Sequence, residues 1–146
     1  MSIRLNRKKL LCISFFLCCV LPACFGWFEY GSETWRGLAL LELPLLVSTT
    51  LFGFALMFER PHYMLPLGIF SHVLLLVFLI RTFFNFPVIS GIAASRDLAL
   101  SLELVRPCYW VGIALPIVHL ALFTTTEIAV QNLAKQSAAQ SKKEDE

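Results

Sequence analysis

The chain has 146 residues, of which 58% are hydrophobic and only 15% are charged, and its formal net charge is +2 at pH 7. Soluble domains carry about 25% charged residues, so this composition, with a mean hydropathy of +0.73, indicates a membrane protein. The small net charge argues against a nucleic-acid partner. The length leaves room for one helical bundle and no separate soluble domain.

Four apolar stretches account for most of the chain, and each is close to the length of about 20 residues that a spanning helix needs. We therefore predict an all-α membrane protein, with one domain over residues 1–134 in which four transmembrane helices form a bundle. The polar segment 135–146 carries charges of both signs and is predicted to be a disordered cytoplasmic tail. The predicted spans are residues 10–28, 38–58, 64–84 and 108–126.

Positive charges are divided unevenly between the two ends of the predicted bundle. Of the 12 Lys and Arg residues, eight lie on the side of the termini and four on the other side. Cytoplasmic loops carry the excess of Lys and Arg, so both termini are predicted to be cytoplasmic in a multi-pass cell-membrane protein. The chain contains no Asn-x-Ser/Thr sequence, which is compatible with a bacterial inner membrane.

The first stretch has a basic start and small residues near its end, as a secretory signal peptide has, and cleavage is one interpretation. We favour an uncleaved first helix because Pro22 is awkward for a cleavage box and the apolar run continues to Phe28. Cys12, Cys18 and Cys19 lie within this stretch without a Cys-x-x-Cys motif or an adjacent His. They are therefore interpreted as small apolar side chains that fill a buried face.

Two charged residues lie near the outer ends of the second and third predicted spans. The tight turn at residues 59–62 makes these two helices antiparallel neighbours, so Glu42 and Arg81 are predicted to form an ion pair. The alternative is that they line a cavity that opens to the outer side. Ionisable residues inside a membrane are candidates for function by default.

The connection between the last two spans contains a helical pattern. From Ile92 onward, Leu98, Leu102 and Val105 recur on one face while Arg96 and Glu103 stay polar. This pattern predicts a short amphipathic helix that lies on the outer membrane surface or caps the bundle. An irregular flexible loop is the alternative.

Two histidines lie within the predicted spans at matched depth. At 1.5 Å per residue, His72 and His119 are each roughly 11–12 Å from the cytoplasmic edge, so their imidazoles could meet across a helix pair. The simplest interpretation is that each neutral imidazole hydrogen-bonds to a nearby hydroxyl or to a carbonyl freed by Pro116. The alternatives are a pair of ligands to haem iron or another metal, or a proton relay. On the simplest interpretation the chain needs no cofactor and no metal.

Two further cysteines fall at the outer interface under this topology. Cys24 lies near the end of the first span and Cys108 begins the last one. If these helices are neighbours, the two thiols could form a disulfide, which the outer side of a membrane permits. Two unpaired thiols are the alternative.

No phosphate-binding loop, catalytic triad order or carboxylate pair at helical spacing is present. The sequence therefore predicts a non-enzymatic accessory or scaffold subunit of a membrane assembly. Its expected partners are the lipid bilayer and other membrane proteins, or further copies of itself. The alternatives are a haem- or metal-binding redox carrier that uses His72 and His119, and a small oligomeric transporter or channel.

Overall fold

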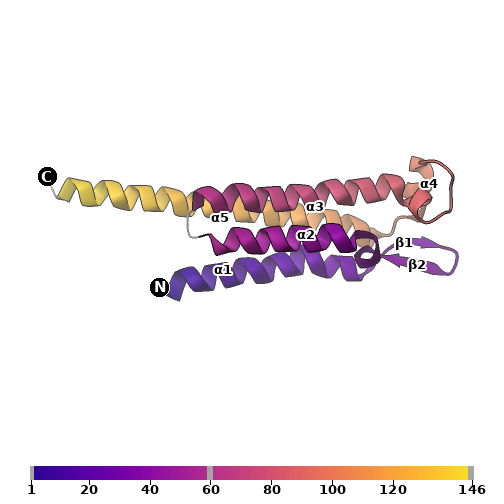
Figure 1. Ribbon diagram of the computed structural model, residues 1–146, viewed down its shortest axis with the longest axis horizontal. Coiled ribbons are helices and arrows are strands. Elements are labelled where there is room, and N and C mark those ends of the chain that lie inside the picture. Colours follow the sequence, from indigo (N-terminus) through magenta and orange to yellow (C-terminus); the bar gives the residue numbers. More distant parts are fainter. Residues whose placement is uncertain (1, 59–60, 145–146) are drawn as a thin grey trace.

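Four helical segments lie side by side and alternate in direction in the computed structural model, which describes residues 2–58 and 61–144 (Figure 1). The elements are α1 (Ser2–Phe15), a π-helical turn η1 (Phe16–Val20), a 3-10 turn η2 (Leu21–Cys24), β1 (Gly26–Tyr30), β2 (Glu33–Arg36), α2 (Gly37–Met57), α3 (Pro61–Ile89), α4 (Leu98–Leu104) and α5 (Pro107–Glu144). The first segment contacts α2 and α5, and α3 also contacts both of these helices. Both ends of the described chain lie at one end of the bundle, while the β1–β2 hairpin and α4 lie at the other (Figure 1).

Three helices are long and apolar enough to cross a membrane. Within the residues that the structure describes, these stretches are Gly37–Met57, Tyr63–Ile89 and Pro107–Ser137. They overlap the second, third and fourth predicted spans, although the last two continue beyond the predicted ends at residues 84 and 126. Apolar side chains such as Val77 and Ile117 are exposed along them, as contact with lipid tails requires. The fold is therefore that of a helical membrane protein.

The first predicted span, residues 10–28, differs from the segment that forms. The helix begins at Ser2 and ends at Cys24, and it passes from α through π to 3-10 geometry on the way. Pro22 has no amide hydrogen and cannot continue the α-helical hydrogen-bond ladder. The prediction that the helix continues to Phe28 is wrong, because that residue lies in β1.

The connection between this helix and α2 is a β-hairpin. β1 and β2 are antiparallel, and Phe28 pairs with Trp35 while Tyr30 pairs with Glu33. The turn uses Gly31 at a φ of 61°, a conformation that glycine adopts without steric cost. The fold thus contains a small sheet that the all-α prediction did not include.

A helix also forms in the connection between α3 and α5. It is shorter than the helical pattern in the sequence, which covers residues 92–106. The Asp97 carboxylate caps α4 by accepting a hydrogen bond at 3.0 Å from the backbone N–H three residues later. Ser101 faces the protein and is buried, whereas Leu98 and Leu102 are exposed. Leu104 is buried in the core and Leu100 packs against it, so α4 has apolar side chains both toward the bundle and away from it.

Backbone contacts join the hairpin to the end of this connection. The Arg106 N–H donates to the Trp27 carbonyl oxygen at 2.7 Å, and Phe28 forms an isolated β-bridge with Val105. The Arg106 guanidinium also contacts the Glu29 carboxylate at 3.2 Å. These contacts attach the hairpin to the start of α5 at one end of the bundle.

The polar tail is the other difference from the sequence prediction. Residues 135–146 are predicted to be disordered, but α5 continues through Glu144; residues 145 and 146 lie outside the described part of the chain. Ala, Gln and Lys dominate this stretch and are among the strongest helix formers. Because the preceding span already supplies the helix nucleus, each added residue needs only to propagate it.

The core of the bundle is aromatic, and one glycine allows a helix to approach one of these rings closely. Phe15 and Phe52 stack with ring centroids 4.2 Å apart, and Phe123 packs on Phe52 at 5.4 Å. A Cβ atom on Gly68 would clash with the Phe123 ring, whereas one on Gly53 would meet nothing within 4 Å. Gly68 therefore allows a close approach between α3 and α5 at the level of Phe123.

Gly68→Ala should destabilise the bundle by about 1–3 kcal/mol, because the added methyl group overpacks the contact with Phe123. Gly53→Ala is the matched control and should be neutral or slightly stabilising, since alanine is the better helix former. Unfolding of the detergent-solubilised protein by SDS, followed by circular dichroism, measures both. Equal stability of the two variants would contradict this packing.

Candidate metal centre

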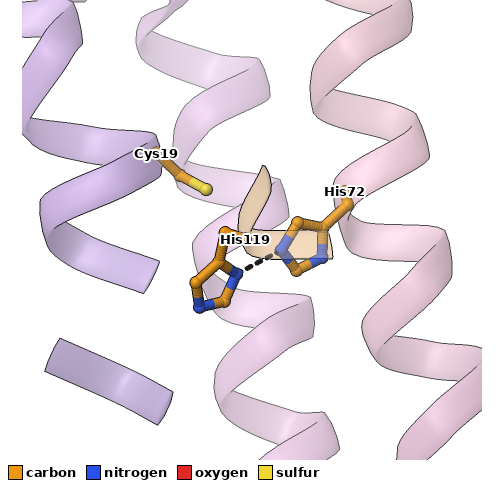
Figure 2. A group of neighbouring side chains, drawn as sticks. All are labelled: Cys19, His72 and His119. Carbon is orange, nitrogen blue, oxygen red and sulfur yellow. Dashed lines mark hydrogen bonds between the residues drawn. The ribbon is translucent and has the colours of Figure 1, made fainter. Parts of the chain in front are cut away.

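Three side chains from three different segments converge in the middle of the bundle (Figure 2). Cys19 comes from η1, His72 from α3 and His119 from α5. One ligand atom from each residue, the Cys Sγ or a His ring nitrogen, lies within 4.8 Å of the other two. All three side chains are buried, with exposed fractions of 5%, 0% and 1% in that order.

The two imidazoles are in direct contact. His72 Nε2 and His119 Nδ1 are 2.7 Å apart, and the ring planes differ by only 13° (Figure 2). The structure therefore brings together the two histidines that the sequence placed at matched depth. At this distance one nitrogen carries the hydrogen and the other accepts it.

The remaining ring nitrogens are each held by an oxygen atom. His72 Nδ1 lies 2.7 Å from the Gly68 carbonyl, and His119 Nε2 lies 2.9 Å from the Ser14 hydroxyl. A carbonyl only accepts, so neutral His72 donates through Nδ1 and presents Nε2 as an acceptor. His119 then donates through Nδ1, and Ser14 donates to its Nε2. One consistent set of hydrogen positions thus satisfies every nitrogen of the neutral pair.

Local sequence explains why these groups point inward. Leu11, Phe15 and Cys19 recur every four residues and form one buried stripe along the first segment. In α3, the His72 ring bonds to the carbonyl one turn earlier in its own helix. Ser14 lies next to this stripe, and its hydroxyl reaches His119 where α1 and α5 are in contact.

Phenylalanine rings enclose the imidazoles. Phe15 and Phe52 each present an edge-to-face contact to both histidines, with ring centroids 5.3–5.7 Å apart. Phe123 stacks on His72 at 6.0 Å. All three phenylalanines are almost completely buried. The site is therefore enclosed by an apolar wall, and electrostatic interactions inside it are stronger than in water.

This donor set suits a single transition-metal ion. A thiolate and two imidazoles are ligands of soft and borderline metals. The oxygen atoms of Gly68 and Ser14 hold the outer ring nitrogens, as second-shell groups do in metal sites. A haem does not fit, because the two rings touch and phenylalanines fill the surrounding space.

Cys19 was missed by the sequence interpretation, which treated it as a packing residue. It carries no metal-binding motif, and its partners lie more than 50 positions away along the chain. The available signal was depth: with the first segment running opposite to α5, Cys19 falls near the middle of the same bundle. Its spacing of four and eight residues from Phe15 and Leu11 also puts it on the buried stripe of the first segment.

A second buried polar pair lies nearer the termini. Arg7 Nη2 and Glu127 Oε2 are 3.4 Å apart, and the Glu127 side chain is completely buried. Arg7 Nε and Glu127 Oε1 have no hydrogen-bond partner in the described part of the chain. Glu127 lies one residue beyond the fourth predicted span, but it shares a helical face with His119 and Phe123, and that spacing was the signal for it.

Glu42 and Arg81 do not form the predicted ion pair. Both side chains are exposed, and among the described residues the salt bridges join Arg7 to Glu127 and Arg106 to Glu29. The reciprocal bonds between Ser48 and Ser71 fix the register of α2 and α3. In that register Arg81 lies about one turn, roughly 5 Å, beyond the level of Glu42.

Cys24 and Cys108 are also not joined. Both carry free thiols and both are exposed. Cys24 ends η2, and Cys108 is the second residue of α5. The disulfide considered from the sequence is therefore absent from the structure.

Comparison with known proteins identifies no relative of this chain. No protein-family model, no curated protein and no solved structure matches it. Its function must therefore be inferred from the chemistry of the bundle.

Cys24 and Cys108 should both be alkylated rapidly by maleimide in the native detergent-solubilised protein, whereas Cys19 should react only after unfolding. The reason is exposure: burial withholds the Cys19 thiol from the reagent. Peptide mass spectrometry without reduction identifies the labelled sites. A peptide crosslinked between positions 24 and 108, or rapid labelling of Cys19, would contradict the structure.

Proposed function

We propose that this chain is a four-span membrane protein in which α1, η1 and η2 together make the first crossing. Its apolar part, residues 10–24, rises roughly 22 Å, so it crosses a core of about 30 Å only where the bilayer thins and the preceding basic side chains extend to the headgroups. Along it, Leu10, Ile13 and Leu17 are exposed, while the opposite stripe packs on α2 and α5. An even number of crossings also agrees with both chain ends lying at one end of the bundle.

In this arrangement both termini are cytoplasmic and the β1–β2 hairpin faces outward, in the cell membrane of a bacterium. The excess of positive charge near the termini supports this orientation. On the outer side, the exposed leucines of α4 contact the headgroup region as the apolar face of an interfacial helix.

Alkaline phosphatase fused after Lys135 should be inactive, and green fluorescent protein fused there should fluoresce, since the tail stays in the cytoplasm. The same two reporters inserted at Ser32, in the turn of the hairpin, serve as the control and should give the opposite result, with an active phosphatase and no fluorescence. Phosphatase activity from the fusion after Lys135 would reverse the topology.

We propose that the chain works without catalysing a reaction, as a subunit of a membrane assembly that holds one transition-metal ion in its core. The single observation that carries this proposal is the convergence of Cys19, His72 and His119 within 4.8 Å inside an apolar wall. The oxygens of Gly68 and Ser14 add support, because they bind the outer ring nitrogens, so that the two nitrogens that face each other are the ones available to an ion that replaces their shared hydrogen.

Two other functions are less well supported by the geometry. A haem carrier requires a slot for the macrocycle between the histidines, and the rings are in contact instead. A transporter requires a path through or beside the bundle, whereas Phe15, Phe52 and Phe123 fill the centre. Other membrane proteins, or further copies of this chain, remain the proposed partners.

Cys19→Ser should abolish stoichiometric metal binding, because a serine hydroxyl does not replace a thiolate for a soft ion. Cys18→Ser is the matched control: it removes the neighbouring thiol, which lies outside the cluster, and should retain the ion. Elemental analysis of protein purified from metal-supplemented membranes measures the ion per chain, and circular dichroism shows that both variants fold. Equal metal content in the two variants would overturn the proposal.

A further inference from the structure

We propose that the ion is Cu(I), held by Cys19 Sγ, His72 Nε2 and His119 Nδ1 in a three-coordinate site. This inference rests on the proposed function and specifies its ligand. Three independent features carry it: the number of ligands, the charge of the completed site, and the hydrogen bonds behind the two histidines.

The number of ligands is the first feature. Within the described part of the chain, no further His, Cys, Asp or Glu joins the group of three. The Ser14 hydroxyl lies behind His119, on the nitrogen that faces away from His72, so it does not point at the ion. Zn²⁺ in proteins is almost always four-coordinate, whereas a site with two His and one Cys in trigonal arrangement is typical of copper.

Charge is the second feature. A thiolate with two neutral imidazoles carries one negative charge, which a monovalent ion neutralises. A divalent ion would leave one uncompensated positive charge within the aromatic wall of Phe15, Phe52 and Phe123. An unpaired charge in an apolar interior is strongly unfavourable. Charge is therefore a second reason, in addition to the softness of the ligands, why the site favours Cu(I) over Zn²⁺.

The hydrogen bonds behind the histidines are the third feature. To bind a metal, His119 must give up the hydrogen on Nδ1 and carry it on Nε2, where it donates to Ser14 Oγ. The Ser14 hydroxyl has a second acceptor ready, since Oγ also lies 3.0 Å from the Leu11 carbonyl. Ser14 can thus donate to His119 in the metal-free state and to Leu11 in the metal-bound state.

The proton balance of binding follows from this exchange. Cys19 forms a bond from Sγ to copper and releases its thiol proton to the medium. The His119 proton moves from Nδ1 to Nε2, and His72 keeps the proton that it donates to Gly68. No electron is transferred, and the site is neutral before and after binding.

The space that the ion needs is small. The facing nitrogens are 2.7 Å apart when they share a proton. With metal–nitrogen bonds of about 2.0 Å in a trigonal arrangement, they would be roughly 3.5 Å apart. The rings therefore need to separate by less than an ångström. In effect the ion takes the place of the shared proton.

The test is an anaerobic titration of the full-length, detergent-solubilised protein with Cu(I), kept reduced by ascorbate, against the chelator bicinchoninate. A parallel titration uses zinc chloride. We expect one Cu(I) per chain, lost in Cys19→Ser and retained in Cys18→Ser, with no displacement by equimolar zinc. X-ray absorption should then show one sulfur and two nitrogen neighbours.

Stoichiometric zinc that depends on Cys19 and is not displaced by Cu(I) would overturn the copper assignment while leaving the proposed function intact. If neither ion binds, or if binding is the same in both cysteine variants, the proposed function fails and this inference fails with it.

Ser14 provides a second test, as a positioning residue that does not touch the ion. Ser14→Ala removes the acceptor for His119 Nε2–H and should weaken Cu(I) binding about 10–100-fold, the usual effect of losing a second-shell partner. Ser14→Thr restores the hydroxyl and should recover the affinity. The coordination seen by X-ray absorption should be the same in all three proteins. Equal affinity of Ser14→Ala and the unaltered protein would contradict the tautomer exchange.

Discussion

The absence of water in the hydrocarbon core is the constraint on which this structure depends. Every polar group that enters the bundle must find its partner within the protein. Ser48 and Ser71 bond reciprocally to each other's carbonyls, and the Tyr109 hydroxyl donates to the Leu79 carbonyl. These bonds join α2 to α3 and α3 to α5. Satisfying the polar groups therefore also sets how the helices pack and at what depth they align.

The histidine pair extends the same rule to the first segment. Ser14 in α1 bonds to His119 in α5, which bonds to His72 in α3, so one chain of hydrogen bonds crosses three segments. Such bonds contribute little individually in a membrane, on average about 0.6 kcal/mol. Their value is specificity, because sliding any one segment would leave several buried groups without partners. The Cys19 thiol is brought to the histidines by this fixed register.

Sequence reasoning succeeded where one physical signal dominated. Apolar length located three helices, and counting residues from a common edge placed His72 and His119 at one depth. It failed where the outcome depended on rotation or on small energy differences. The approach of Cys19 to two histidines depends on how three separate segments pack, and the separation of Glu42 from Arg81 depends on a register set by two serines. Neither is encoded in hydrophobicity.

The metal-free site is already complete in its hydrogen bonds, and this distinguishes it from small metal-dependent domains. In zinc fingers the free energy of metal binding is the free energy of folding, so the chain unfolds without the ion. Here each ring nitrogen of His72 and His119 has a partner, and phenylalanines pack around both. The bundle therefore holds its ligands in place without a metal. On the proposed function, binding an ion would require the two rings to separate and His119 to change tautomer, but not the helices to fold.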